Sequence, residues 1–232
     1  MISKDFAKIA KVISDSINLK KHIVAVKLFD DLNDVPDDLP RPDNKIFYCG
    51  AVAQAMQGKT LLLLEEDHLC DRGAYVLGVK EPNDNVINGK MYAKGHMVES
   101  DRAGKRLIEE APKIPVGKTK AILLTPLEES KFDPDVVIIA ANPYQSLVIL
   151  NATNYKNGLE IPIRTQIFTS FCAYATVLPF KYGKPNATLP QKQARVRSQL
   201  PDEEMLIGIP GELIEEVSEI ISGLCCIRKP DN

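Results

Sequence analysis

Two almost wholly apolar runs constrain the fold of this chain more than any other sequence feature. Residues 121–127 (AILLTPL) and 136–140 (VVIIA) are separated by an acidic turn that ends at Asp133-Pro134-Asp135. A strand with one face in water alternates apolar and polar residues, whereas a strand covered on both faces is apolar throughout. We therefore predict an α/β (mixed α+β) fold, with a central, mostly buried sheet flanked by helices.

Apolar residues spaced by three and four predict amphipathic helices over 2–18 and 210–224. Cys49 begins a small-residue helix that should end at Gly58, and Cys172 begins a similar one over 172–177. Ser100 and Asn142 are expected to cap two more helices. Further strands are predicted over 22–29, 60–64, 161–168 and 205–209, and a polar, proline-punctuated loop over 181–199.

The length and composition are those of an ordinary globular protein. Of 232 residues, 44% are hydrophobic and 26% charged, and a chain of this size can bury roughly 70% of its unfolded surface. We expect a single domain over 1–232. A short echo between Phe47-Tyr48-Cys49 and Phe171-Cys172, each followed by small residues and Gly-Lys, leaves open a weak internal duplication with halves of about 1–115 and 116–232.

Charge and hydropathy argue against two classes of partner. The 29 basic and 31 acidic residues are interspersed and give a net charge of −2, unlike the basic face of a nucleic-acid-binding protein. The longest apolar run, 136–141, is far shorter than the ~20 residues of a membrane span, and charges interrupt the N-terminal segment where a signal peptide would be apolar. We expect a cytoplasmic protein without nucleic-acid or membrane partners; homo-oligomerisation stays open.

The cysteines are the most informative polar feature. They number five, an odd count in a chain without a secretory signal, which favours free thiols over disulfides: Cys49, Cys70, Cys172, Cys225 and Cys226. Residues 65–71 (EEDHLCD) gather carboxylate, imidazole and thiol ligands at the end of a predicted strand, and strand ends are where open α/β sheets place their sites.

Cys49, Cys70 and Cys172 all lie at boundaries of predicted elements. Three converging thiolates could hold an iron–sulfur cluster or another thiophilic metal, with His68, Asp71 or an exogenous ligand in the fourth place. Their separations of 21 and 102 residues match no compact cysteine signature. Since buried cysteine often acts as a small apolar filler, a protein with no cofactor stays open.

Two other function classes compete with metal binding. The first is a metal-free binding module for a small anionic metabolite or tetrapyrrole-like ligand, held near Asn142 at a helix start and Arg195. In this reading the basic segment with Lys192, Arg195 and Arg197 would grip the anion. The second is a thiol-based enzyme with Cys70 as its nucleophile. The sequence does not decide whether the protein is an enzyme.

A series of short motifs, in a fixed order over nearly the whole chain, resembles one known family. The motifs are 23–27 (IVAVK), 47–49 (FYC), 69–70 (LC), 134–137 (PDVV), 141–145 (ANPYQ), 171–173 (FCA), 183–189 (GKPNATL) and 204–210 (EMLIGIP). They are similar to the prokaryotic, largely archaeal and anaerobic family called domain of unknown function 169.

This resemblance implies no established activity, but it bears on the cysteines. It implies family cysteines at the positions of Cys49, Cys70 and Cys172, and often a fourth after the Thr-Leu-Pro segment, where this chain has Gln191. The resemblance therefore favours a metal or redox centre, either as a three-cysteine site or with a fourth ligand that is not a thiolate.

Overall fold

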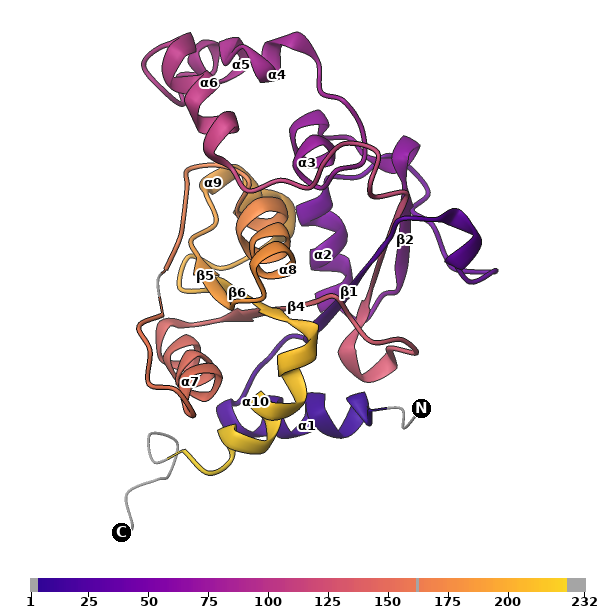
Figure 1. The fold of residues 1–232 in the computed structure, drawn as a ribbon, viewed down its shortest axis with the longest axis vertical. Coiled ribbons are helices and arrows are strands. Elements are labelled where there is room, and N and C mark those ends of the chain that lie inside the picture. The colour runs from indigo at the N-terminus through magenta and orange to yellow at the C-terminus, as the bar shows by residue number, and fades with distance from the viewer. Residues whose placement is uncertain (1–3, 162, 225–232) are drawn as a thin grey trace.

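A six-stranded sheet forms the centre of the protein in a computed structural model that describes residues 4–161 and 163–224 (Figure 1). The strands are β1 (Val24–Phe29), β2 (Leu61–Leu64), β3 (Ala121–Pro126), β4 (Val136–Ala141), β5 (Asn186–Thr188) and β6 (Met205–Pro210). Their order is β2-β3-β1-β4-β6-β5, and every neighbouring pair is antiparallel. Because β1 lies between β3 and β4, strands from the two halves of the chain interleave in one sheet.

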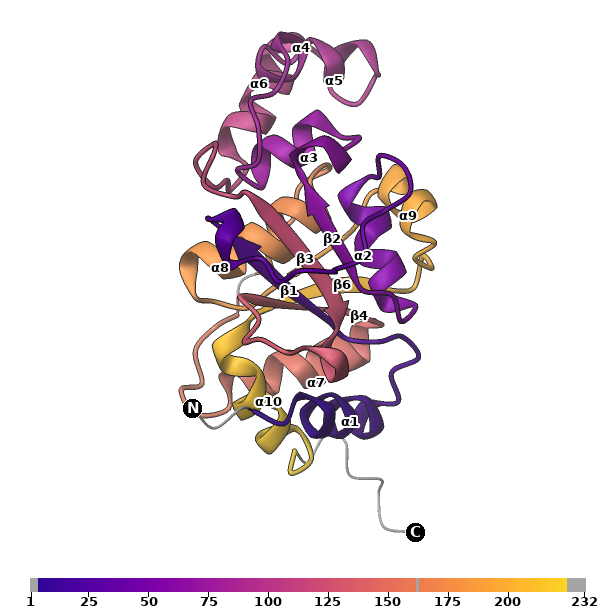
Figure 2. The same ribbon diagram turned by 90° about the vertical axis from the view of Figure 1, so that its right-hand side faces the viewer.

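Helices cover both faces of this sheet (Figure 2). They are α1 (Phe6–Ile17), α2 (Tyr48–Met56), α3 (Asp71–Val76), α4 (Asp84–Ile87), α5 (Lys90–Lys94), α6 (Asp101–Glu110), α7 (Pro143–Asn154), the π-helix η4 (Ser170–Val177), α8 (Leu178–Tyr182), α9 (Lys192–Ser198) and α10 (Ile214–Ile221). Helices α1, α7 and α10 pack on one face, and α2 and η4 pack on the other. Helices α4 to α6 project beyond the sheet (Figure 1).

Strand β4 shows how the two cores divide. Val136, Ile138 and Ala140 belong to the core shared with α2 and η4. The alternating residues Val137 and Ile139 belong to the core shared with α1, α7 and α10. Every residue of β4 is buried, because both of its faces are covered by helices. The predicted buried sheet flanked by helices is confirmed.

Three predicted helix ends are confirmed by their hydrogen bonds and backbone angles. The Ser100 hydroxyl accepts from Ala103 N (3.3 Å) at the start of α6, and Asn142 Oδ1 accepts from Gln145 N (2.9 Å) at the start of α7. Gly58 follows α2 with a φ of +95°, the left-handed conformation that favours glycine after a helix. The helix predicted over 2–18 is α1, and residues 1–3 lie outside the described part.

Two predictions in the second half are wrong. Residues 163–168 form no strand, although 161–168 was predicted as one, and 181–199 is not a loop, because it holds β5 and α9. Strand β5 occupies the sheet edge beside β6. Its Asn186 side chain binds the backbone of Arg164 from both sides, accepting from N (2.9 Å) and donating to O (3.0 Å). A side-chain amide thus supplies the hydrogen bonds that strand pairing would have provided.

Candidate functional site

Three cysteines that are distant in sequence line one pocket on the α2 face of the sheet. Cys49 lies in the first turn of α2, Cys70 directly precedes α3, and Cys172 lies in η4. All three are free thiols and all three line the same pocket. The structure therefore brings together the cysteines that the sequence singled out. Cys225 and Cys226 lie outside the described residues.

Gly73 leaves a gap between two of the sulfur atoms. Cys70 caps α3, and its Sγ accepts a hydrogen bond from Gly73 N (3.4 Å). A Cβ added at Gly73 would stand 3.6 Å from Cys70 Sγ and 3.7 Å from Cys172 Sγ. The space beside the Gly73 Cα is therefore bounded by a sulfur atom on two sides. A methyl group would fit into this space without severe overlap.

An unusual helix presents Cys172. The π-helix η4 is buried at every residue, and it follows Thr169, which has a left-handed φ of 62°. A β-branched residue rarely adopts that conformation, and π-helical segments are frequent at functional sites. Tyr48 Oη lies 2.9 Å from Thr176 Oγ1. This hydrogen bond fixes η4 against α2, and so holds the segment of Cys172 against that of Cys49.

Burial keeps two of the thiols protonated at neutral pH. Desolvation raises the pKa of Cys49 to about 11, although the Arg197 cation opposes the rise. Desolvation also raises the pKa of Cys172 to about 12; the neighbouring Cys70 adds to this rise and Arg72 opposes it. Because the thiolate is the nucleophile and the metal ligand, these two side chains are unreactive until something removes their protons.

The pocket walls also carry two arginines without a matching carboxylate. Arg72 is only 8% exposed, and its guanidinium lies 4.5 Å from the Phe168 ring centroid and 5.5 Å from that of Tyr92. The Arg197 guanidinium lies 3.7 Å from the Phe47 ring centroid. Among the described residues that line the pocket there is no Asp or Glu. The cysteine pocket therefore has an excess of positive charge.

Two buried polar atoms in the cysteine pocket lack a hydrogen-bond partner among the described residues. They are Arg72 Nε and Ser170 Oγ, and both residues line the pocket. An unsatisfied polar group costs about 1–3 kcal/mol when it is buried. Such atoms need a partner from a bound ligand or an ordered water molecule.

The donor set and the space suit a small metal centre better than a large one. Thiolates are the ligands of zinc, copper(I) and iron–sulfur clusters, and the gap at Gly73 lies between two of them. In the described part of the chain, no three His, Cys, Asp or Glu side chains form a preformed ligand group. The cysteine side chains must therefore turn toward a common point. The pocket has about 30 Å³ of free volume, so a multi-iron cluster requires its walls to separate.

His68 does not line the cysteine pocket, although it was predicted as a fourth ligand. It is 3% exposed, and its Nε2 has no hydrogen-bond partner in the described range. Burial lowers its pKa to about 4, with Asp67 opposing and Lys80 assisting. Asp71, the other candidate, forms an ion pair with Lys80 (3.0 Å).

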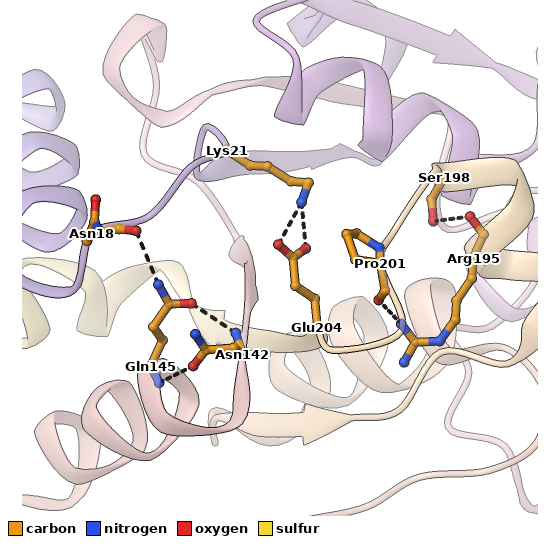
Figure 3. A network of polar contacts seen from close by, with 8 residues as sticks. All are labelled: Asn18, Lys21, Asn142, Gln145, Arg195, Ser198, Pro201 and Glu204. Atoms are coloured by element: carbon orange, nitrogen blue, oxygen red, sulfur yellow. Dashed lines mark hydrogen bonds and ion pairs between the residues drawn. The ribbon is translucent and has the colours of Figure 1, made fainter.

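Asn142 and Arg195, the predicted anion-binding residues, have structural partners (Figure 3). Asn142 and Gln145 cap α7 reciprocally, and Gln145 Nε2 donates to Ile17 O (2.8 Å) at the end of α1. Arg195 Nε donates to Pro190 O (2.9 Å), and its Nη1 donates to Pro201 O. Neither Asn142 nor Arg195 lines the cysteine pocket.

The sequence reading missed Arg72 and Ser170 and considered Arg197 only with its neighbours. Arg72 is two residues after Cys70, and Ser170 is two residues before Cys172, so proximity to the cysteines was the available signal. Gln191, where the family resemblance implies a fourth cysteine, also lines the pocket. Its side chain caps α9 and accepts from Ala194 N (3.2 Å).

Fold and site together define a class: a three-layer α/β/α protein with an antiparallel sheet and a cysteine-lined pocket on one face. The chain belongs to the family domain of unknown function 169 (DUF169), described as "Uncharacterised ArCR", whose model matches residues 12–219. This confirms the resemblance found in the sequence. A curated relative, the uncharacterized protein MJ0308 of Methanocaldococcus jannaschii, is 28% identical over 214 residues, which cover 91% of each chain. No solved structure matches the chain.

Proposed function

We propose that this protein binds a thiophilic metal cofactor, either a single soft ion or an iron–sulfur cluster, through Cys49, Cys70 and Cys172. The observation that supports it is that three free thiols, 21 and 102 residues apart in sequence, line one pocket. Three soft ligands with a free fourth position are typical of reactive metal sites.

The surrounding residues would hold such a centre in place. Arg72 and Arg197 offset the negative charge of three thiolates, and the Tyr48–Thr176 hydrogen bond keeps α2 and η4 together. When bound, the metal would supply Lewis-acid or electron-transfer chemistry. Because His68 is outside the pocket lining, the fourth position falls to an exogenous ligand.

Free thiols need a reducing compartment, so we place this protein in the cytoplasm. Over residues 4–161 and 163–224, no helix has both the length and the apolar character to cross a bilayer. The partners we propose are a metal cofactor and a small molecule at its open position, without nucleic acid.

Anaerobic purification tests the metal proposal directly. The wild-type protein should carry zinc, copper or iron, with sulfide and visible absorption if a cluster is present. The triple variant Cys49→Ser/Cys70→Ser/Cys172→Ser should lose the metal while keeping its far-ultraviolet circular dichroism. The double variant Cys225→Ser/Cys226→Ser is the matched control and should load like wild type. A metal-free wild type from metal-supplemented anaerobic cultures, or a triple variant that loads fully, would contradict the proposal.

Gln191 offers a test in which a ligand is gained. Because it lines the pocket, Gln191→Cys should add a fourth thiolate and make the bound metal more resistant to a chelator. Gln191→Ser is the control, since serine keeps a capping group for α9 but adds no soft ligand. Equal rates of metal loss from both variants would show that position 191 does not reach the metal.

A second candidate function, thiol chemistry at Cys70, rests on one hydrogen bond and on a contrast with the other two cysteines. The side chain is half-buried and its sulfur accepts from Gly73 N (3.4 Å), whereas burial keeps the thiols of Cys49 and Cys172 protonated by raising their pKa values. In reduced, metal-free protein a small alkylating reagent should then label Cys70 before Cys49 and Cys172. Mass spectrometry of the peptides would reveal the order; uniform labelling would exclude a selectively activated Cys70.

A further inference from the structure

We propose that the cysteine pocket binds a small oxyanion, a carboxylate or a phosphate, between Arg72 and Arg197 and beside the thiols. This site differs from the one that the sequence suggested around Asn142 and Arg195. It needs no metal, because both guanidinium groups stay charged whether or not the cysteines carry one.

Arg72 is held in a position suited to an anion. Its guanidinium is placed against the rings of Phe168 and Tyr92, at 4.5 and 5.5 Å from their centroids, and the residue is 8% exposed. Rings on which the guanidinium packs fix its orientation, and the hydroxyl of Tyr92 lies within reach of some of its donors. Its Nε has no hydrogen-bond partner in the described part of the chain. The Nε–Nη edge of arginine binds two oxygens of a carboxylate or phosphate at once.

Ser170 and Arg197 complete the subsite. Ser170 is 1% exposed and lines the same pocket as Arg72, and its hydroxyl has no hydrogen-bond partner within the described residues. Arg197, packed over Phe47 at 3.7 Å, lines the pocket from α9. Arg72, Arg197 and Ser170 all belong to the lining of a cavity whose described residues include no carboxylate. An anion is therefore the ligand that satisfies all three groups.

The size of the cavity limits the ligand. About 30 Å³ of free volume admits a group of a few atoms. That is compatible with a free small anion, or with the charged end of a larger metabolite whose remainder stays outside the cavity. Because the thiols line the same pocket, the bound oxyanion lies next to the sulfur atoms, where it could also complete the coordination of a metal.

Calorimetry and thermal denaturation with defined probes test this inference. Chelator-treated, reduced protein is titrated with acetate, malonate and inorganic phosphate against chloride at constant ionic strength, and the metal-loaded protein is titrated in parallel. At least one probe should bind and raise the melting temperature. Preference for the carboxylates or for phosphate identifies the ligand class. Arg197→Gln should weaken binding about tenfold or more, as expected for a lost charged hydrogen bond, and Ser170→Ala by a smaller factor.

Arg106→Gln, at an exposed position of α6, is the matched control and should bind like wild type. Arg72→Lys keeps the charge but loses the two-pronged edge, and it should also bind more weakly; if it fails to fold, Arg197→Gln and Ser170→Ala decide. The inference is overturned if no probe binds better than chloride, or if these variants bind as tightly as wild type. Anion binding by protein that never loads metal would refute only the metal proposal.

Discussion

The two faces of the central sheet are built from the same strands, but the helices that cover them bury different kinds of side chain. On one face α1, α7 and α10 bury a continuous apolar layer. Among the described residues of these three helices, one buried polar side-chain atom, Ser146 Oγ, has no hydrogen-bond partner. The other face carries three thiols, a π-helix, a left-handed Thr169 and the unpartnered Arg72 Nε and Ser170 Oγ. The first face holds the protein together, whereas the second tolerates features that cost stability.

A substitution at Gly208 should reduce stability most, because at this position β6 lies directly against η4, on the face of the sheet that carries the cysteine pocket. A Cβ at Gly208 on β6 would lie 2.1 Å from Ala175 O and 2.8 Å from Pro179 Cγ. Gly208→Ala must therefore push η4 off the sheet, and we expect a loss of at least about 3 kcal/mol, the upper range for overpacking, measured by urea denaturation. Gly50→Ala, whose Cβ would meet its nearest atom at 3.5 Å, is the control. Equal stability of the two variants would contradict this account.

Ile13 tests the apolar face. It is fully buried in α1, so Ile13→Ala should cost about 3 kcal/mol through the cavity it leaves, while the folded variant still loads metal. Lys8→Ala, exposed on the same helix, should cost far less. If Ile13→Ala altered metal loading of folded protein, the two faces would not be functionally separate.

His68 should make the stability of the folded protein depend on acid, because its pKa is lowered by burial. Its pKa is about 4 in the folded protein against 6.5 for an ordinary histidine. Unfolding between these values takes up a proton, so stability falls as pH drops from 6.5 to 4, by up to about 3 kcal/mol. His68→Asn should flatten this decline in denaturation curves recorded across the range. The exposed control His96→Asn should leave it in place, and an unchanged slope in His68→Asn would assign the decline to other groups.

Gly73 should show the smallest effect on stability and a clear effect on binding. Gly73→Ala places a methyl group 3.6 and 3.7 Å from two sulfur atoms, which are ordinary contacts, and alanine favours a helix. We expect a stability change within about 1 kcal/mol, together with metal affinity at least about tenfold weaker. Competition with a chromogenic chelator measures the affinity. Full affinity in this variant would place the metal away from Gly73.

The sequence predicted two kinds of feature: helix caps, which depend on neighbouring residues, and strands that are buried on both faces. The runs behind β3 and β4 are almost wholly apolar, and the caps at Ser100 and Asn142 are formed by neighbours three residues away. It did not predict α4 and α5, short helices held by a contact between distant backbones. Gly89 approaches Gly104 so closely that a Cβ at Gly104 would lie 2.4 Å from Gly89 O. The sequence of residues 84–94 alone does not predict that contact, because its partner Gly104 lies outside this segment.

Residue type alone pointed to the cysteines of the candidate site, but not to the other residues that the fold brings beside them. Thiols are rare enough to attract attention, and the three cysteines that the sequence offered as metal ligands, Cys49, Cys70 and Cys172, line one pocket; their role as ligands stays a prediction. Arginine and serine are common, and a buried Arg72 reads in sequence like a solvated one. His68 shows the converse: it is two residues from Cys70, yet it lies outside the pocket lining, because the chain turns between them at the start of α3.

The spacing of the cysteines has a consequence for how the protein is made. The pocket draws residues from position 47 to position 197, so most of the chain must leave the ribosome before the site exists. Closing loops of this length is entropically costly, and thiols so far apart do not chelate a metal by themselves. In contrast to a zinc finger, which folds around its ion, this protein should reach its native fold empty. Under the metal proposal, loading would then be a late step, in which the metal enters an already finished pocket.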